Sequence, residues 1–197
     1  MNRFNIFNQV HKALRELLFD TASRLQQTDF ANEEETTEIL RQTTTVINLF
    51  EKHAATEDSF VLPAISVYEP AVSTLFADEH IADHELGEKL RSVVKGLQES
   101  ASLNDKCTWG TVLRPVFFEF MVFNLEHMAK EEEVLNKLLW RYYSDEDLHA
   151  LTGRIIEAMP PDAMQQYSTW MIRSLNNSEI AAWLKQTAAT APEFIFR

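Results

Sequence analysis

Two stretches of this chain repeat apolar residues in alternating steps of four and three, and a histidine and a glutamate interrupt each repeat. The first stretch comprises Ile39, Thr43, Val46, Phe50, His53, Glu57 and Phe60. The second comprises Leu113, Phe117, Phe120, Asn124, His127, Glu131, Val134 and Leu138. This spacing puts all members of a stretch on one buried face of a helix in a left-handed bundle. The sequence therefore predicts two long helices that carry ionisable side chains into an apolar core.

The remainder of the chain also favours helices. Its 197 residues include only 4 glycines and 6 prolines, too few to punctuate an all-β fold. We predict four long helices, over residues 5–27, 33–62, 71–99 and 111–142. Pro63 should end the second helix, and Pro115 should either lie in the first turn of the fourth or kink it. Four such helices with short connections predict an all-α fold, an up-down-up-down four-helix bundle.

Residues 144–197 predict a short helical extension. Ser144 with Asp147 resembles a capping box, and Asn176 with Glu179 should begin a last helix. We therefore divide the chain into a bundle, residues 1–143, and an extension, residues 144–197, that packs on the bundle within the same domain. The apolar side chains of the tail, Phe194 to Phe196, are expected to dock on the bundle as well.

Charge and composition exclude several classes of protein. The formal net charge is −12, which argues against binding of nucleic acid or of an anionic membrane, because both need clustered Lys and Arg. Cys107 is the single cysteine, so an intramolecular disulfide and a cysteine-based zinc site are excluded. The N-terminus lacks a signal pattern, and no apolar run approaches about 18 residues. We expect a soluble cytoplasmic protein.

Histidines also lie on the inner faces of the other two predicted helices. His80 and His84 are four residues apart, and His11 is flanked by apolar residues. Any one buried histidine is more often satisfied by its neighbours than bound to metal. An unpaired buried carboxylate, however, costs several kcal/mol, and two of them here would share one layer with five imidazoles. Two divalent cations would compensate this charge, and Fe, Mn or Zn suits these donors better than Ca or Mg.

The order of these residues along the chain resembles the haemerythrin-like domain. The motifs are His11, His53-x-x-x-Glu57, His80-x-x-x-His84, and His127 followed by Glu131. The resemblance implies a non-haem di-iron centre. One iron would be held by His80, His84 and His127, and the other by His11 and His53, with one coordination position open. Glu57 and Glu131 would bridge the irons together with an oxo or hydroxo group.

The last carboxylate needs a choice between two neighbours. In the oxygen-carrying members it is an Asp five residues after its His, which corresponds to Glu132, whereas other branches use a Glu four residues after. The heptad spacing selects Glu131, because Glu132 is rotated about 100° away from the buried face. We therefore expect Glu131 to be the ligand, and Glu132 and Glu133 to be solvated. Asp83, Glu85 and Glu126 are candidates for orienting imidazole N–H groups.

A narrower likeness concerns the C-terminal part. The segments that carry it are His127-Met-Ala-Lys-Glu-Glu-Glu-Val, Tyr143-Ser-Asp-Glu-Asp-Leu, Ala158-Met-Pro-Pro and Trp170-Met-Ile-Arg-Ser-Leu. They look like the haemerythrin domains of eukaryotic iron-sensing ubiquitin ligases. Because the sequence has no F-box, RING or cysteine-rich finger region, we expect the ligase role not to carry over. Iron or oxygen sensing remains open.

These patterns favour a binding protein over an enzyme. Once the ligands are assigned, no obvious general acid, base or nucleophile is left in the buried faces. We expect reversible binding of dioxygen or a related diatomic such as nitric oxide, for sensing, storage or delivery. The alternatives are a di-iron enzyme or iron donor (peroxide or nitric oxide reduction, iron–sulfur repair), and a metal-dependent regulatory interaction domain. Zn or Mn in place of iron, and a protein partner, also stay open.

Overall fold

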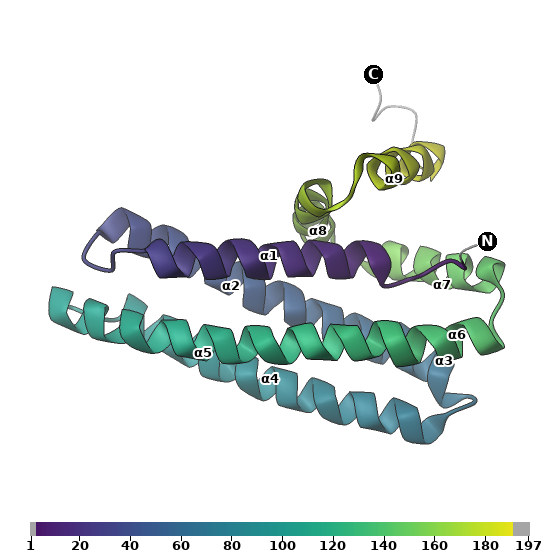
Figure 1. The fold of residues 1–197 in the computed structure, drawn as a ribbon, viewed down its shortest axis with the longest axis horizontal. Coiled ribbons are helices and arrows are strands. Elements are labelled where there is room, and N and C mark those ends of the chain that lie inside the picture. The colour runs from purple at the N-terminus through teal and green to yellow at the C-terminus, as the bar shows by residue number, and fades with distance from the viewer. Residues whose placement is uncertain (1–2, 191–197) are drawn as a thin grey trace.

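The computed structural model describes residues 3–190, with side chains described as far as residue 185. Every regular element in this range is a helix, which confirms the all-α prediction (Figure 1). The four long helices are α1 (Asn8–Gln27), α2 (Glu33–Thr56), α4 (Pro70–Gln98) and α5 (Leu103–Lys130). Contacts join α1 to α2, α2 to α4, α4 to α5 and α5 to α1, so the four helices enclose a common core.

Side-chain caps begin the helices where the sequence predicted them. Asn32 accepts from the backbone N–H groups of Glu34 and Glu35 at the start of α2. Ser144 and Asp147 form a reciprocal capping box at the start of α7 (Asp145–Ala158). Asn176 accepts from the N–H groups of Ser178 and Glu179 ahead of α9 (Asn177–Thr190). Each cap satisfies donors that have no partner inside the helix.

Two helices continue through a π-helical segment at the predicted glutamates. The segment η1 (Glu57–Val61) joins α2 to α3 (Leu62–Ser66), and η2 (Glu131–Leu135) joins α5 to α6 (Asn136–Tyr142). A π turn holds an extra residue, so the buried face shifts by one position after it. Val61, Leu135 and Leu139 are therefore buried, where the heptad spacing predicted Phe60, Val134 and Leu138. Those three predictions were wrong for this reason.

Two predicted boundaries were also wrong. Pro63 does not end the helix, because it lies in the first turn of α3, directly after the wide π turn, where a missing N–H removes no α-helical bond. The last long helix begins at Leu103 rather than near residue 111, since the Ser102 side chain accepts from the Asp105 N–H and caps it there. Pro115 consequently lies inside α5.

The apolar core has two parts with a polar layer between them. One cluster includes Leu14, Phe50, Leu90 and Phe120 of the four long helices. The other includes residues of the N-terminal turn and of α3, α4, α6 and α7: Phe7, Ile65, Phe76, Leu139 and Leu148. On every long helix the predicted histidine or glutamate falls between a residue of one cluster and a residue of the other. The layer that holds these groups is thus closed by apolar side chains at both ends.

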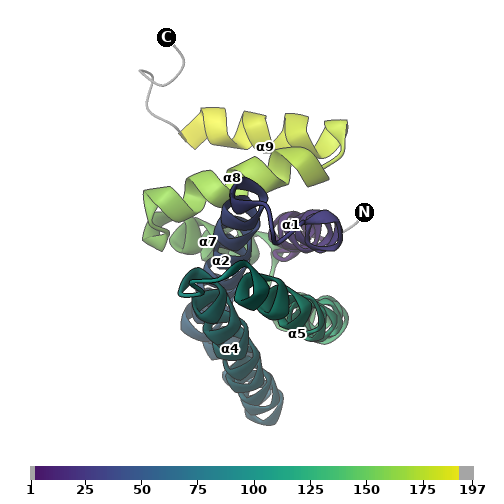
Figure 2. The same ribbon diagram turned by 90° about the vertical axis from the view of Figure 1, so that its left-hand side faces the viewer.

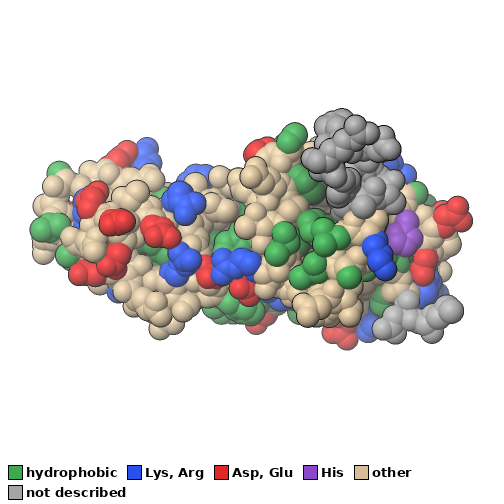
Figure 3. Space-filling view, turned by 90° about the horizontal axis from the view of Figure 1, so that it is seen from above, with side chains coloured by type: hydrophobic (Ala, Val, Ile, Leu, Met, Phe, Trp, Pro, Cys, Tyr) green, Lys and Arg blue, Asp and Glu red, His purple; other side chains and the backbone are tan. Residues whose placement is uncertain are grey.

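The extension continues with α8 (Pro161–Ser174) and α9, which lie over α1 and α2 in Figure 2. The buried Tyr167 hydroxyl donates to the Leu49 carbonyl at 2.6 Å, and Arg173 pairs with Asp20 at 2.7 Å. On the face seen from above in Figure 1, acidic and basic side chains are interspersed (Figure 3). The predicted docking of Phe194 to Phe196 lies outside the described residues. Among the described helices, none is both long and apolar enough to span a membrane.

Candidate metal centre

Six of the seven predicted ligands meet in the polar layer, in two groups that share both glutamates. The first group consists of His11, His53, Glu57 and Glu131. The second consists of His80, His127, Glu57 and Glu131. Within each group, one ligand atom from every residue lies within 4.8 Å of the others. The layer therefore offers two adjoining four-donor sites built from four helices and the two π-helical segments.

Glu57 divides its two oxygens between the groups. Its Oε1 lies 3.3 Å from His53 Nε2, and its Oε2 lies 3.3 Å from His80 Nε2. Glu57 is the first residue of the π-helical segment η1. Because the π turn widens the helix at this point, it re-aims the side chains that follow while the helix continues. Such an irregularity at a charged, buried residue is typical of functional sites.

Glu131 repeats this arrangement from the other side. Its Oε1 lies 3.0 Å from His127 Nε2, and its Oε2 lies 3.4 Å from His11 Nε2. It too is the first residue of a π-helical segment, η2. Each group consequently contains two imidazole nitrogens and one oxygen from each glutamate. This is the donor geometry of two cations bridged by two carboxylates.

The donor atoms are buried, and six of the eight lack the partners that buried polar atoms require, while Nε2 of His11 and Nε2 of His53 lie 3.2 Å from each other. Glu131 and His11 are completely buried, and Glu57 is 2% exposed. Both carboxylate oxygens of each glutamate, and Nε2 of His80 and of His127, have no hydrogen-bond partner among the described residues. Burial of such atoms is costly unless they are paired or coordinate a metal. Nitrogen and oxygen donors in this number fit iron, manganese or zinc.

The electrostatics of the layer point to missing positive charge. Burial opposes the charged form of His80, yet Glu131 and Glu57 raise its pKa to about 11. Burial likewise opposes the charged form of His127, yet Glu131 raises its pKa to about 9. Burial disfavours ionised Glu131, but the His127 and His80 imidazoles hold its pKa well below its ordinary value. The carboxylates thus attract cations, and metal ions would compete with protons for these imidazoles.

Three imidazoles are oriented by carboxylates from outside. The Nδ1–H of His11 donates to Glu132 at 2.9 Å, that of His80 to Asp58 at 2.7 Å, and that of His127 to Glu79 at 2.8 Å. Such a bond leaves the Nε2 lone pair facing the interior and makes the imidazole a stronger ligand. Carboxylate-bound histidines of this kind are typical of metal sites.

The orienting role of these three carboxylates was not predicted from the sequence. Each adjoins a predicted ligand in the chain but serves a histidine on a neighbouring helix: Asp58 follows Glu57, Glu79 precedes His80, and Glu132 follows Glu131. Glu132 was expected to be solvated. The candidates proposed instead do not take this role, because Glu85 and Glu126 are exposed and Asp83 bonds to Asn124. The signal in the sequence that could have identified them is an acidic residue directly before or after a predicted ligand.

The structure does not bring His84 into either group, and its side chain is exposed. The buried face of α4 runs through Phe76, His80, Asp83 and Gly87. After His80 the next inward position is therefore three residues on, at Asp83. His84, one residue further, is rotated about 100° away from it. A spacing of four residues leaves both members of the pairs His53/Glu57 and His127/Glu131 buried. On α4 the same spacing leaves His84 exposed.

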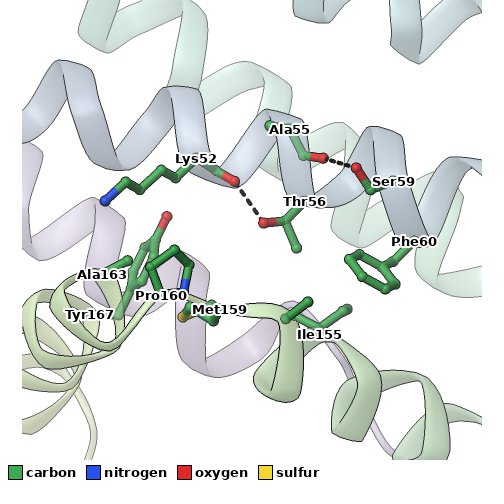
Figure 4. Close-up of a pocket in the computed structure, with 11 residues that line it drawn as sticks. Lys52, Ala55, Thr56, Ser59, Phe60, Ile155, Met159, Pro160, Ala163 and Tyr167 are labelled. Atoms are coloured by element: carbon green, nitrogen blue, oxygen red, sulfur yellow. Dashed lines mark hydrogen bonds between the residues drawn. The ribbon is translucent and has the colours of Figure 1, made fainter.

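Two surface cavities lie away from this layer, one of them, of about 620 Å³, between α2, the end of α4 and the start of α5. A cavity of about 330 Å³ lies between α2 and the turn from α7 to α8, with Thr56, Phe60, Met159 and Tyr167 in its wall (Figure 4). None of the six clustered ligands lines it. Because all six clustered ligands are buried, the two groups lie inside the protein core.

Comparison with known proteins gives a family match. The family described as "Hemerythrin HHE cation binding domain" matches residues 2–139. F-box/LRR-repeat protein 5 of Salmo salar is 24% identical over 152 residues, which are 77% of this chain and 21% of that protein. The same protein of Danio rerio is 23% identical over 77% of this chain and 22% of the relative. This chain thus spans about a fifth of the length of these relatives.

Proposed function

Because the chain belongs to the haemerythrin HHE cation-binding family, we propose that it is a non-haem di-iron protein. Its function is to bind dioxygen or a related diatomic molecule reversibly, for sensing, storage or delivery. One observation carries the proposal. Each of two buried glutamates directs one carboxylate oxygen to the first imidazole pair and the other oxygen to the second pair, with oxygen-to-nitrogen distances of 3.0–3.4 Å. Two cations, one in each group, would supply the charge and the partners that these donors lack.

The assignment of ligands follows the two groups. His11 and His53 would hold one iron, His80 and His127 would hold the other, and Glu57 and Glu131 would bridge them. When bound, a pair of irons supplies redox chemistry and a coordination position for a diatomic molecule. His84 is left out of this assignment because its side chain is exposed.

The chain contributes a dry, rigid chamber. Phe7 lies 5.0 Å from the His11 ring, Phe76 lies 5.9 Å from the His127 ring, and Phe123 stacks on His127 at 6.0 Å (ring centroids). These rings separate the donors from water, which strengthens every charge interaction inside. They also restrict entry to small neutral molecules. Because most side chains that could act as acids or bases here serve as ligands or orient them, binding without turnover is the simplest use.

We also propose an up-down-up-down connection of α1, α2, α4 and α5, and a single domain that includes residues 144–197. The support for the first is the closed ring of contacts between these helices. The support for the second is that Ala163 and Tyr167 of α8 belong to the same apolar cluster as Leu14 and Phe50.

Metal analysis and spectroscopy test the proposal together. The purified chain should contain two irons, identified by absorption edge. Anaerobic ferrous protein should develop near-ultraviolet and visible bands of an oxygen-bridged or oxygen-bound iron pair on exposure to air. A chain that holds two irons but stays colourless in air would contradict dioxygen binding. A chain that takes up only Zn or Mn would contradict the iron assignment.

A second candidate is a regulatory domain whose fold depends on metal. The observation that favours it is the set of unpartnered carboxylate oxygens, since removal of the ions would leave these charges buried. The relatives are F-box/LRR-repeat proteins, of which this chain covers about a fifth. Chelation of the metal should then lower the melting temperature by many degrees. An unchanged melting temperature without metal would exclude this candidate.

A further inference from the structure

Asp83 is a buried carboxylate that the di-iron assignment does not use. It lies on α4, one turn after His80, and is 5% exposed. Its hydrogen-bond partner is Asn124 Nδ2 at 2.6 Å, and Asn124 lies one turn before His127 on α5. Burial raises the pKa of Asp83, and the charges that oppose this rise most are those of His127 and His80. Because Asp83 follows His80 by one turn and its partner Asn124 precedes His127 by one turn, the carboxylate lies one turn away from the ligands of the second group.

The surroundings of the two groups differ in fixed charge. Two carboxylates contact the imidazoles of the second group, Asp58 and Glu79, and Lys130 pairs with Glu79 at 2.8 Å. Asp83 adds a third carboxylate one turn away. The corresponding contacts of the first group are one carboxylate and one guanidinium, because Glu132 holds His11 and pairs with Arg15 at 2.8 Å. The described contacts thus make the second group the more negative one.

We propose that the His80–His127 group binds its metal ion more tightly than the His11–His53 group and fills first, and that Asp83 is a positioning residue that contributes to this difference. The inference rests on the proposed function, since it takes both groups as metal sites. An anion in a poorly polarisable interior attracts a divalent cation over several ångströms. The first group is then the one whose occupancy responds to the metal supply.

Stepwise loading of the metal-free full chain with Fe²⁺ under anaerobic conditions, against a competing chelator, tests the order. The wild-type chain should fill in two steps of different affinity. Asp83→Asn should weaken the tight step by about 10-fold or more and leave the weak step unchanged. Asp78→Asn is the matched control, because it is the same change at an exposed position of the same helix, and it should alter neither step.

Variants that keep one group each make the test independent of how Asp83→Asn folds. His11→Ala should retain one ion at the tight affinity, and His80→Ala should retain one at the weak affinity, with helicity checked by circular dichroism. Two equal steps, or the reverse order in these variants, would overturn the inference while leaving the di-iron proposal intact. If Asp83→Asn binds both ions with wild-type affinities, Asp83 does not contribute to the difference between the groups. Failure of the wild-type chain to bind any ion would instead contradict the proposed function.

Discussion

The two halves of the candidate centre have equal donors and unequal surroundings. His11 and His53, from α1 and α2, face His80 and His127, from α4 and α5, across the same two glutamates. In both halves the two imidazole rings are 5.0 Å apart. The outer contacts differ, since both imidazoles of the second half donate to a carboxylate, Asp58 or Glu79, whereas the first half has one such described contact, from His11 to Glu132. A cation pairs with one carboxylate in each half, Lys130 with Glu79 and Arg15 with Glu132. Identical ligand sets therefore need not make two metal positions equivalent.

Removal of a shared carboxylate should have the largest effect, because it breaks both halves at once. Glu131→Gln removes the negative charge that both groups share and replaces one of the two oxygen donors with an amide nitrogen that cannot bind a cation, so both ions should be lost, with affinities reduced by more than about 100-fold. The measurement is metal content after dialysis. Glu133→Gln, at an exposed neighbouring position, is the control and should retain both ions. Retention of two ions by Glu131→Gln would mean that this residue does not bridge.

Removal of one imidazole should break one half only. His53→Ala should reduce the metal content from two ions to one, because His80 and His127 keep their donors. His149→Ala should change nothing, since this exposed ring lies against Phe4, at 3.9 Å between centroids, outside both groups.

His84→Ala tests the difference between sequence and structure directly. Because this side chain is exposed, the variant should still bind two ions. Loss of one ion from this variant would return His84 to the ligand set and restore the unequal numbers of imidazoles that the family resemblance implied.

The outer carboxylates should sharpen the comparison with a smaller effect. Asp58→Asn should weaken metal binding by the second group by about 10- to 100-fold, because a neutral amide is a weaker acceptor than a carboxylate for the His80 Nδ1–H. Glu132→Gln should weaken the first group instead, since it holds His11. Competition with a chelator for each ion separates the two outcomes. Equal effects of the two variants on both ions would show that the halves are not independent.

The smallest effect should come from the contact between the extension and α1, the helix of His11. Lys12 lies 2.6 Å from Glu179 of α9 and, with the Asn176 backbone, lowers the pKa of Glu179 from 4.5 to about 2. A lowered folded-state pKa stabilises the fold above the unfolded value, and this contribution is lost as pH falls from 4.5 towards about 2.

Glu179→Gln should therefore melt slightly below the wild type at about pH 7, and the difference should shrink below about pH 4.5 and vanish at about pH 2. Thermal melts followed by circular dichroism measure this difference. A gap in melting temperature that persists unchanged at the acidic pH would contradict the ion pair as its cause.

Much of the polar layer could be predicted from residue spacing, because the position of a residue along a helix sets the direction in which its side chain points. His53, Glu57, His127 and Glu131 lie on heptad faces, and all four are buried. The preference for Glu131 over Glu132 followed from the same geometry, and the structure places Glu131 in both groups and Glu132 outside them. The same rule, applied to α4, would have selected Asp83 rather than His84 as the inward position after His80.

By itself, then, the sequence determined the all-α fold, the caps and the kinds of donor that meet in the core, since these depend on local propensity and periodicity. Tertiary structure alone decided the π turns, which shift the buried face to Val61 and Leu135, and the pairing of Asp58, Glu79 and Glu132 with histidines of other helices. These features depend on how one helix is rotated and displaced against the next. That relation is set by packing of the whole core, and no spacing along a single helix contains it.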